Sequence, residues 1–195
     1  MTNAPPDASP DTSSVAHLDP CLAGLSRPVT ETGLGRALET LGIQTKTLEH
    51  APTFTVNEGA DVKATLPGGH TKNLFMTDGR GGFVLVSAWA ESRLRLNRLH
   101  KVIGGRRLSF GAAEDMQRLL GVTPGSVTGF AVLNDTDGAV RFVLDAALKP
   151  FDVWNFHPLR NDRTTAISAA DFVAFATACG HPPTFVDFAA APFIE

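Results

Sequence analysis

The chain has 195 residues, 43% of them apolar, which suits one domain large enough to bury a full hydrophobic core. The formal net charge is −3, so a nucleic-acid partner would have to meet a local basic patch, not the protein as a whole. The two cysteines and six histidines show no metal-ligand spacing, and a metal site is not expected. No apolar run approaches the roughly 20 residues that span a bilayer, so we expect no membrane partner and a cytoplasmic location.

The expected organisation is a tail followed by one domain. Residues 1–28 are rich in Pro, Asp, Ser and Thr and lack apolar periodicity, which predicts a mobile N-terminal tail. The domain covers residues 29–195. Leucines on one face predict a first helix from near residue 30 to Gly42, and a capping box at 55–58 predicts a second, short helix that ends before Pro67.

Strands and further helices alternate along the rest of the chain. The expected strands are 43–49, 71–77, 83–88, 128–134, 139–145, 152–156 and 164–167, and the expected later helices are about 92–102, 112–120 and one from Ser168 to Gly180. Hairpins interleaved with helices favour an α+β single domain with a mixed, mainly antiparallel sheet flanked by helices.

A lysine lies in the middle of the expected strand 71–77. Alternation places Lys72 on the same face as Leu74 and Met76, so an ammonium group is embedded among apolar side chains. Such a lysine extends to the surface, pairs with an anion or lines a cleft that receives one.

Four other segments could carry chemistry. The loop Gly125-Ser126-Val127-Thr128-Gly129 could approach a ligand closely and present backbone N–H groups to it. His157 ends a strand just before a proline, and His50 with Phe54 and Thr55 could form the lip of a pocket. A basic stretch, which is either a solvated helix face or a phosphate footprint, contains Arg93, Arg95, Arg98, Lys101, Arg106 and Arg107.

An ordered set of motifs resembles the YbaK/ProX superfamily of aminoacyl-tRNA deacylases, and within it the free-standing prolyl-tRNA editing proteins called ProXp-ala or PrdX. The motifs are His50-x-Pro52-x-Phe54-Thr55, Gly68 to Phe75, Leu120 to Thr128, Asn134-Asp135, Asn155 to Leu159, and Asn161. The resemblance covers roughly residues 30 to 182. One departure is Gly129, where the superfamily's G-x-x-x-P motif ends in proline.

The resemblance implies a trans-editing hydrolase that clears alanine wrongly attached to proline tRNA, without metal or organic cofactor. It implies a cationic role for Lys72, substrate contacts from the backbone of Gly125 to Gly129, and an ordering role for Asn73 and His157. The pocket would be sized by the lip at His50, Phe54 and Thr55. The acceptor end of proline tRNA would meet Arg95, Arg98, Lys101, Arg106 and Arg107, and prolyl-tRNA synthetase would be a transient partner.

Two other functions remain open at this stage. A related enzyme could clear another small residue, such as serine or cysteine, because superfamily members share the lysine and differ in pocket lining. Alternatively, the chain could be an aminoacyl-tRNA or RNA-binding module without catalysis.

Overall fold

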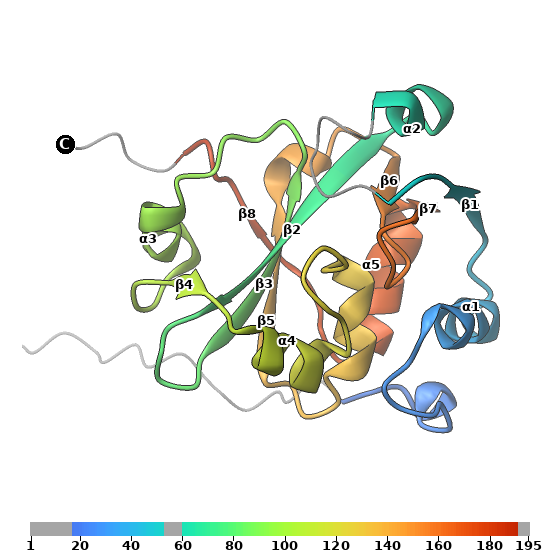
Figure 1. Cartoon of the computed structure of the whole chain (residues 1–195), viewed down its shortest axis with the longest axis horizontal. Coiled ribbons are helices and arrows are strands. Elements are labelled where there is room, and N and C mark those ends of the chain that lie inside the picture. The colour runs from blue at the N-terminus through green and yellow to red at the C-terminus, as the bar shows by residue number, and fades with distance from the viewer. Residues whose placement is uncertain (1–16, 53–59, 191–195) are drawn as a thin grey trace, which may run out of the picture.

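The computed structural model describes residues 17–52 and 60–190 (Figure 1). Phe54, Thr55 and the capping box at 55–58 therefore lie outside the described residues, as does the tail before residue 17. Among the described residues, none of the helices has the length and apolar character needed to cross a bilayer.

One mixed sheet forms the centre of the molecule. Its strands are β1 (Thr45–Glu49), β2 (Gly69–Thr77), β3 (Phe83–Trp89), β4 (Ser109–Phe110), β5 (Val140–Asp145), β6 (Val153–Phe156), β7 (Arg163–Ser168) and β8 (Thr184–Val186). They lie in the order β1-β7-β6-β2-β3-β5-β8, and β4 pairs with β2. Antiparallel pairs outnumber parallel ones, so the expected α+β domain with a mixed, mainly antiparallel sheet is confirmed.

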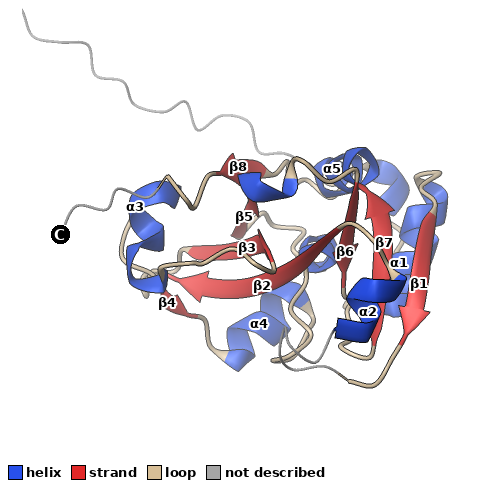
Figure 2. Ribbon diagram, turned by 90° about the horizontal axis from the view of Figure 1, so that it is seen from above, coloured by secondary structure: helices blue, strands red, loops and turns tan. Residues whose placement is uncertain are grey.

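Helices cover both faces of this sheet (Figures 1 and 2). The α-helices are α1 (Glu31–Thr40), α2 (Ala60–Thr65), α3 (Leu99–Ile103), α4 (Ala113–Leu120) and α5 (Ala169–Ala178), and the 3-10 helices are η1 (Pro20–Leu22), η3 (Leu96–Arg98), η4 (Gly129–Asn134) and η5 (Ala146–Leu148). The larger core joins α1, α4, η4 and α5 to one face, and a smaller core joins α3 to the other.

The strand β2 has an unusual set of neighbours. Its residues Thr71–Thr77 pair with β3, but on the other edge it meets β6 only at Gly69 and His70 and β4 only at Met76 and Thr77. In Figure 2, β2 leaves β6 at one end and runs toward β4 at the other. Between these two contacts, among the described strands, the second edge of β2 is open.

Two expected elements are wrong in type or extent. The segment 128–134 is not a strand, because Thr128 accepts a hydrogen bond from the Phe130 N–H (3.3 Å) and begins the 3-10 helix η4. A short apolar run that is buried on all sides does not distinguish strand from helix by periodicity. The helix expected at 92–102 begins only at Leu96, so residues 92–95 are irregular.

Part of the expected tail is packed against the domain. Leu22, in η1, is completely buried in the larger core, and the Arg27 guanidinium donates to the Leu133 carbonyl (2.5 Å). Residues 17–28 contain too few apolar positions to show periodicity, yet one well-placed leucine is enough to attach them. The described structure therefore differs from a tail that runs to residue 28.

Candidate functional site

Lys72 lies on the face of β2 that carries Leu74 and Met76, as alternation predicts. Its Nζ donates to the Ala90 carbonyl (3.0 Å) and to the Ser92 carbonyl, so the residues after β3 bend around the ammonium group. Burial lowers the pKa of Lys72, while the carboxylates of Glu91 and Asp145 oppose that shift. Among the described residues, the ion pairs do not include Lys72. Two carbonyls leave one of the three ammonium donors for a substrate.

Three histidines extend from Lys72 along the same side of the molecule. His70 precedes Lys72 by two residues and shares its face of β2. His70 pairs in register with Asn155 of β6, and His157 follows Asn155 by two residues on the same face, while the His157 and His50 ring centroids are 6.2 Å apart. We call His50, His157, His70 and Lys72 the polar row.

The hydrogen bonds fix the tautomer of His157. Its Nδ1 lies 2.9 Å from the Arg163 carbonyl, and since a carbonyl only accepts, Nδ1 carries the proton and Nε2 keeps its lone pair. Burial lowers the pKa of His157, so the ring is neutral at pH 7. The following turn is strained, because Leu159 has φ 65° and its N–H donates to the His157 carbonyl (3.0 Å). His157 is thus an oriented hydrogen-bond acceptor.

His50 is held in a comparable way. Its Nδ1–H donates to the Ala51 carbonyl (2.8 Å), and its Nε2 accepts from the Thr164 hydroxyl (2.9 Å). In His70, Nε2–H donates to the Leu66 carbonyl (2.8 Å), and burial is the main cause of its lowered pKa. Each of the three rings is therefore fixed by a backbone carbonyl from a different segment of the chain.

Asn73 faces the opposite side of β2 from Lys72. It pairs in register with Ser87 of β3, whose hydroxyl donates to Asn73 Oδ1 (2.5 Å). Asn73 Nδ2 lies 3.5 Å from the Thr71 hydroxyl, too long for a strong hydrogen bond, so the amide can still donate to a ligand. The Ser87 hydroxyl would lie 3.1 Å from a Cβ at Gly129, which links Asn73 to the Gly125–Gly129 loop.

The loop from Gly125 to Gly129 turns tightly before η4. Gly125 has φ 91°, and the Ser126 N–H donates to the Thr123 carbonyl (3.0 Å). Ser126 and Val127 are half-buried, whereas Thr128 and Gly129 are buried. The backbone would accept the motif proline at 129, because Thr128 is extended (φ −154°, ψ 155°) and proline suits the first position of a helix. The obstacle is space, since a Cβ at Gly129 would lie 2.7 Å from Phe172 Cζ.

The expected site residues thus form two groups on opposite faces of β2. The polar row lies on one face, and Asn73 with the Gly125–Gly129 loop lies on the other. The open edge of β2 joins them. The Ala90 N–H donates to the His70 carbonyl, so the main-chain groups of His70 point toward β3. Main-chain groups of successive residues point to alternate edges of a strand, and those of Thr71 and Asn73 therefore point toward the other, open edge.

The basic stretch is not one helix face. Arg95 precedes η3, Arg98 ends it, Lys101 lies in α3, and Arg106 and Arg107 lie in the turn before β4. Arg98 is half-buried and the other four are exposed. Of the expected pocket lip, His50 joins the polar row, and Phe54 and Thr55 lie outside the described residues.

Sequence reasoning missed three residues of this region. His70 could have been assigned from alternation alone, because it is two residues from Lys72. Ser87 required the hairpin register. Asp145, which is buried, accepts from the Trp89 N–H (3.2 Å) and the Ser92 hydroxyl (2.5 Å), and so holds the segment that binds Lys72. No pattern in the sequence indicated that contact. Among the described residues, no three His, Cys, Asp or Glu side chains are grouped to hold a metal ion.

A comparison with known protein families gives a match between residues 50–175 and the aminoacyl-tRNA editing domain. The chain belongs to the aminoacyl-tRNA editing domain family. The matched range includes the whole polar row and the Gly125–Gly129 loop. The family predicted from the sequence motifs is therefore confirmed.

Relatives of this editing domain carry names connected with prolyl-tRNA. The chain is 36% identical to prolyl-tRNA synthetase associated domain-containing protein 1 of Bos taurus, over 80% of this chain and 93% of the relative. It is 32% identical to the prolyl-tRNA editing protein ProX of Acetoanaerobium sticklandii, over 74% of this chain and 88% of the relative.

The fold also agrees with a solved structure. A crystal structure described as a candidate trans-editing enzyme for prolyl-tRNA synthetase superposes with a TM-score of 0.62 at 20% identity, covering 83% of this chain and 99% of that one. At this identity the likeness concerns the fold alone. The editing domain therefore belongs to the prolyl-tRNA editing family by sequence and shares its architecture.

Proposed function

We propose that this editing domain hydrolyses mischarged aminoacyl-tRNA, with alanine on proline tRNA as the preferred substrate. The observation that carries the proposal is the ammonium group of Lys72, half-buried within β2 and held by two carbonyls. A cation in this position offers a directed donor to the carbonyl oxygen or the terminal nucleotide of an ester substrate. Removal of one such donor typically slows an acyl-transfer enzyme about 10²–10³-fold.

The reaction requires no covalent nucleophile. Water attacks the acyl carbon, the bond to the terminal ribose oxygen breaks, and that oxygen takes a proton, which gives free amino acid and uncharged tRNA. The neighbouring ribose hydroxyl of the substrate assists the water. His157 Nε2 is a fixed acceptor that orders this hydroxyl or the water, and the backbone of Gly125 to Gly129 holds the aminoacyl group.

The need for such an enzyme follows from the limits of synthetase selectivity. A pocket built for a larger side chain rejects a smaller one by only about 1–3 kcal/mol for a missing methylene, so a second site must remove the product of the error. A pocket that accepts alanine and excludes the prolyl ring would do so. The lip at His50 and the Phe54-Thr55 segment are its proposed boundary.

Activity on mischarged tRNA tests the proposal. Purified protein should deacylate alanyl-tRNA for proline, and Lys72→Ala should lose most of that activity while keeping the native circular dichroism spectrum. Lys46→Ala, which removes an exposed lysine from β1, is the matched control and should retain full activity. Full activity in a folded Lys72→Ala variant would exclude the lysine from the mechanism.

Specificity is tested with a panel of mischarged tRNAs. We expect the highest kcat/KM on alanyl-tRNA for proline. A higher value on seryl- or cysteinyl-tRNA would replace the alanine assignment. Inactivity on every aminoacyl-tRNA, combined with retained binding, would favour a module that binds aminoacyl-tRNA without catalysis.

A further inference from the structure

Asp145 is a buried carboxylate at the end of β5, with only 1% of its surface exposed. Among the described residues, the ion pairs do not include it. A carboxylate that is removed from water without a cation in contact destabilises a protein, unless hydrogen bonds replace its hydration. Buried charges of this kind are concentrated at functional sites, so the contacts of Asp145 indicate what it does.

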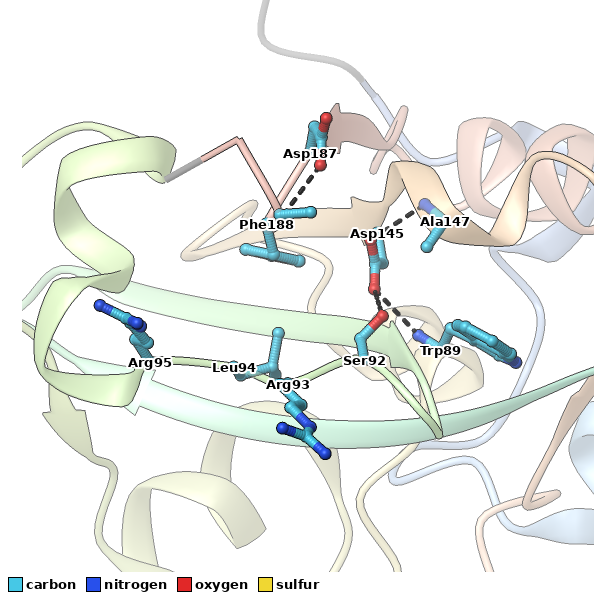
Figure 3. Close-up of a pocket in the computed structure, with 10 residues that line it drawn as sticks. Trp89, Ser92, Arg93, Leu94, Arg95, Asp145, Ala147, Asp187 and Phe188 are labelled. Atoms are coloured by element: carbon cyan, nitrogen blue, oxygen red, sulfur yellow. Dashed lines mark hydrogen bonds between the residues drawn. The ribbon is translucent and has the colours of Figure 1, made fainter. Parts of the chain in front are cut away.

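Three hydrogen bonds fix the Asp145 carboxylate (Figure 3). Its Oδ1 accepts from the Ala147 N–H (3.0 Å), and its Oδ2 accepts from the Trp89 N–H (3.2 Å) and from the Ser92 hydroxyl (2.5 Å). Trp89 and Ser92 are the first and last residues of a turn, which the Ser92 N–H closes by donating to the Trp89 carbonyl (2.9 Å). Asp145 therefore bridges both ends of this turn. We call residues 89–92 the lysine turn.

The lysine turn connects Asp145 to Lys72. The Ala90 and Ser92 carbonyls accept from Lys72 Nζ, so Ser92 binds Asp145 through its hydroxyl and Lys72 through its carbonyl. Lys72 is also outside the ion pairs of the described residues. Two opposite charges that lack a direct partner thus lie on either side of one serine.

This indirect contact leaves the ammonium group able to bind a substrate. A carboxylate in direct contact with Lys72 would occupy a donor and neutralise the charge that an ester carbonyl or a phosphate requires. Here carbonyl oxygens hold two of the donors, and the negative charge of Asp145 raises the pKa of Lys72 against the effect of burial. The lysine therefore keeps both its charge and its third donor.

We propose that Asp145 is the counter-ion and the positioning residue of Lys72, and that it acts through the lysine turn. It fixes the two carbonyls that orient the ammonium group, and it compensates the charge of that group without contacting it. The proposal rests on the proposed function for the reaction in which Lys72 takes part. The relation between Asp145 and Lys72 can be measured without that reaction.

Other charges near Lys72 are placed differently from Asp145. Glu91, in the middle of the lysine turn, raises the pKa of Lys72, and Lys63 of α2 lowers it. Glu91 is exposed, and its Oε1 pairs with Lys63 Nζ (2.6 Å). His70 shares the face of β2, and since its pKa is lowered, it is neutral at alkaline pH. Glu91 thus acts on Lys72 by charge, whereas Asp145 acts by charge and by its hydrogen bonds to the turn.

Activity on alanyl-tRNA for proline, measured against pH and corrected for spontaneous hydrolysis, separates these effects. Ser92→Ala removes a hydrogen bond and no charge, so kcat should fall about tenfold while activity is lost at the same alkaline pH as in wild type. Glu91→Gln removes a charge from the exposed side of the turn, so kcat should be kept and the alkaline loss should move to lower pH. Asp145→Asn should show both changes.

A matched control and a conservative variant complete the kinetic test. Asp187, also drawn in Figure 3, accepts from the N–H groups of two nearby alanines at 2.9 and 3.2 Å, so Asp187→Asn should behave as wild type. Ser92→Thr keeps the hydroxyl and should retain most of the activity that Ser92→Ala loses. Equal kcat in Ser92→Ala and wild type would overturn the proposal, and this comparison decides even if Asp145→Asn fails to fold.

The pKa of Lys72 gives an answer that does not depend on hydrolysis. An NMR titration of the lysine side chains, with the Lys72 signal assigned by its loss in Lys72→Ala, measures this pKa directly. It should be lower in Asp145→Asn than in wild type and unchanged in Asp187→Asn. An unchanged pKa in folded Asp145→Asn refutes the counter-ion even if the protein deacylates tRNA. If hydrolysis fails but the pKa falls, the proposed function fails and the counter-ion stands.

Discussion

Substitution of Gly129 by alanine should destabilise the protein, because the space for one more carbon is occupied. A Cβ at this position would lie 2.7 Å from Phe172 Cζ and 2.9 Å from Phe156 Cε1. The two phenylalanine rings are stacked with centroids 4.1 Å apart, and both are buried. They can move only by displacing other members of the larger core.

The size of the effect follows from two opposing contributions. Overpacking of this kind costs about 1–3 kcal/mol. The loss of glycine's freedom in the unfolded chain returns about 0.4–1 kcal/mol, so the net loss in the free energy of unfolding is about 1–2 kcal/mol. At about 2–4 °C per kcal/mol, Tm should fall by about 2–8 °C. Urea titration and thermal unfolding, both followed by circular dichroism, measure the two quantities.

A matched control is available in α1. Gly35 is exposed, and a Cβ there would meet nothing within 4 Å, so Gly35→Ala should stabilise the helix by about 0.5–1 kcal/mol. In a double-mutant cycle, Phe172→Leu should reduce the cost of Gly129→Ala by about 0.5 kcal/mol or more. If Gly129→Ala behaves like Gly35→Ala, or if its cost adds independently to that of Phe172→Leu, the steric reasoning is refuted.

Four further predictions concern titration, thiol reactivity and the N-terminus. Lys72 must be protonated to act, and burial lowers its pKa. Activity, corrected for spontaneous ester hydrolysis, should therefore be lost as the pH rises, at a pH below the ordinary pKa of lysine. If the same loss at alkaline pH persists in Lys72→Ala, Lys72 is not the group that titrates. His157 must be neutral to accept a hydrogen bond at Nε2, and burial lowers its pKa. In the same plot of activity against pH, the loss of activity on the acid side should therefore occur below the ordinary pKa of histidine. A loss at the ordinary pKa would argue against this role of His157. Cys21 is exposed and Cys179 is buried, so iodoacetamide should label Cys21 of the native protein first and both thiols only in urea, as mass spectrometry would show. Hydrogen bonding to Asp19 raises the pKa of Cys21 and burial raises that of Cys179, so the expected difference rests on access; equal rates would refute the buried position. Deletion of residues 1–16 should leave Tm unchanged, whereas deletion of residues 1–26 removes Leu22 and should cost about 2–5 kcal/mol; equal Tm values would show that η1 does not contribute.

Local pattern predicted the elements that are half-exposed or have clear ends. Alternation placed Lys72 on the correct face of β2, and the turn residues from Asp78 to Gly82 marked the end of β2 and the start of β3. The same reasoning failed at η4, where five consecutive residues are fully or almost fully buried and no face is polar. Whether such a segment forms a strand or a helix depends on the residues that pack against it, which here are the phenylalanine rings of α5 and β6.

The site was predictable as a set of residues and not as an arrangement. Motifs identified Lys72, Asn73 and His157, and their catalytic roles stay predictions. That Lys72 and Asn73 face opposite sides follows from alternation, but the contact between Asn73 and Ser87 depends on the hairpin register.

Along the order β1-β7-β6-β2-β3-β5-β8, the ladder of backbone hydrogen bonds is shortest between β2 and β6, and we expect the two sides of this contact to open separately. Backbone hydrogen bonds connect β1, β7 and β6 on one side and β2, β3, β5 and β8 on the other, but only Gly69 and His70 bridge the two. Amide protons within each set should therefore exchange with deuterium cooperatively and at two distinct free energies. A ligand that spans the open edge of β2 would merge them, and slower exchange in both sets on addition of aminoacyl-tRNA would report that the halves had become one unit.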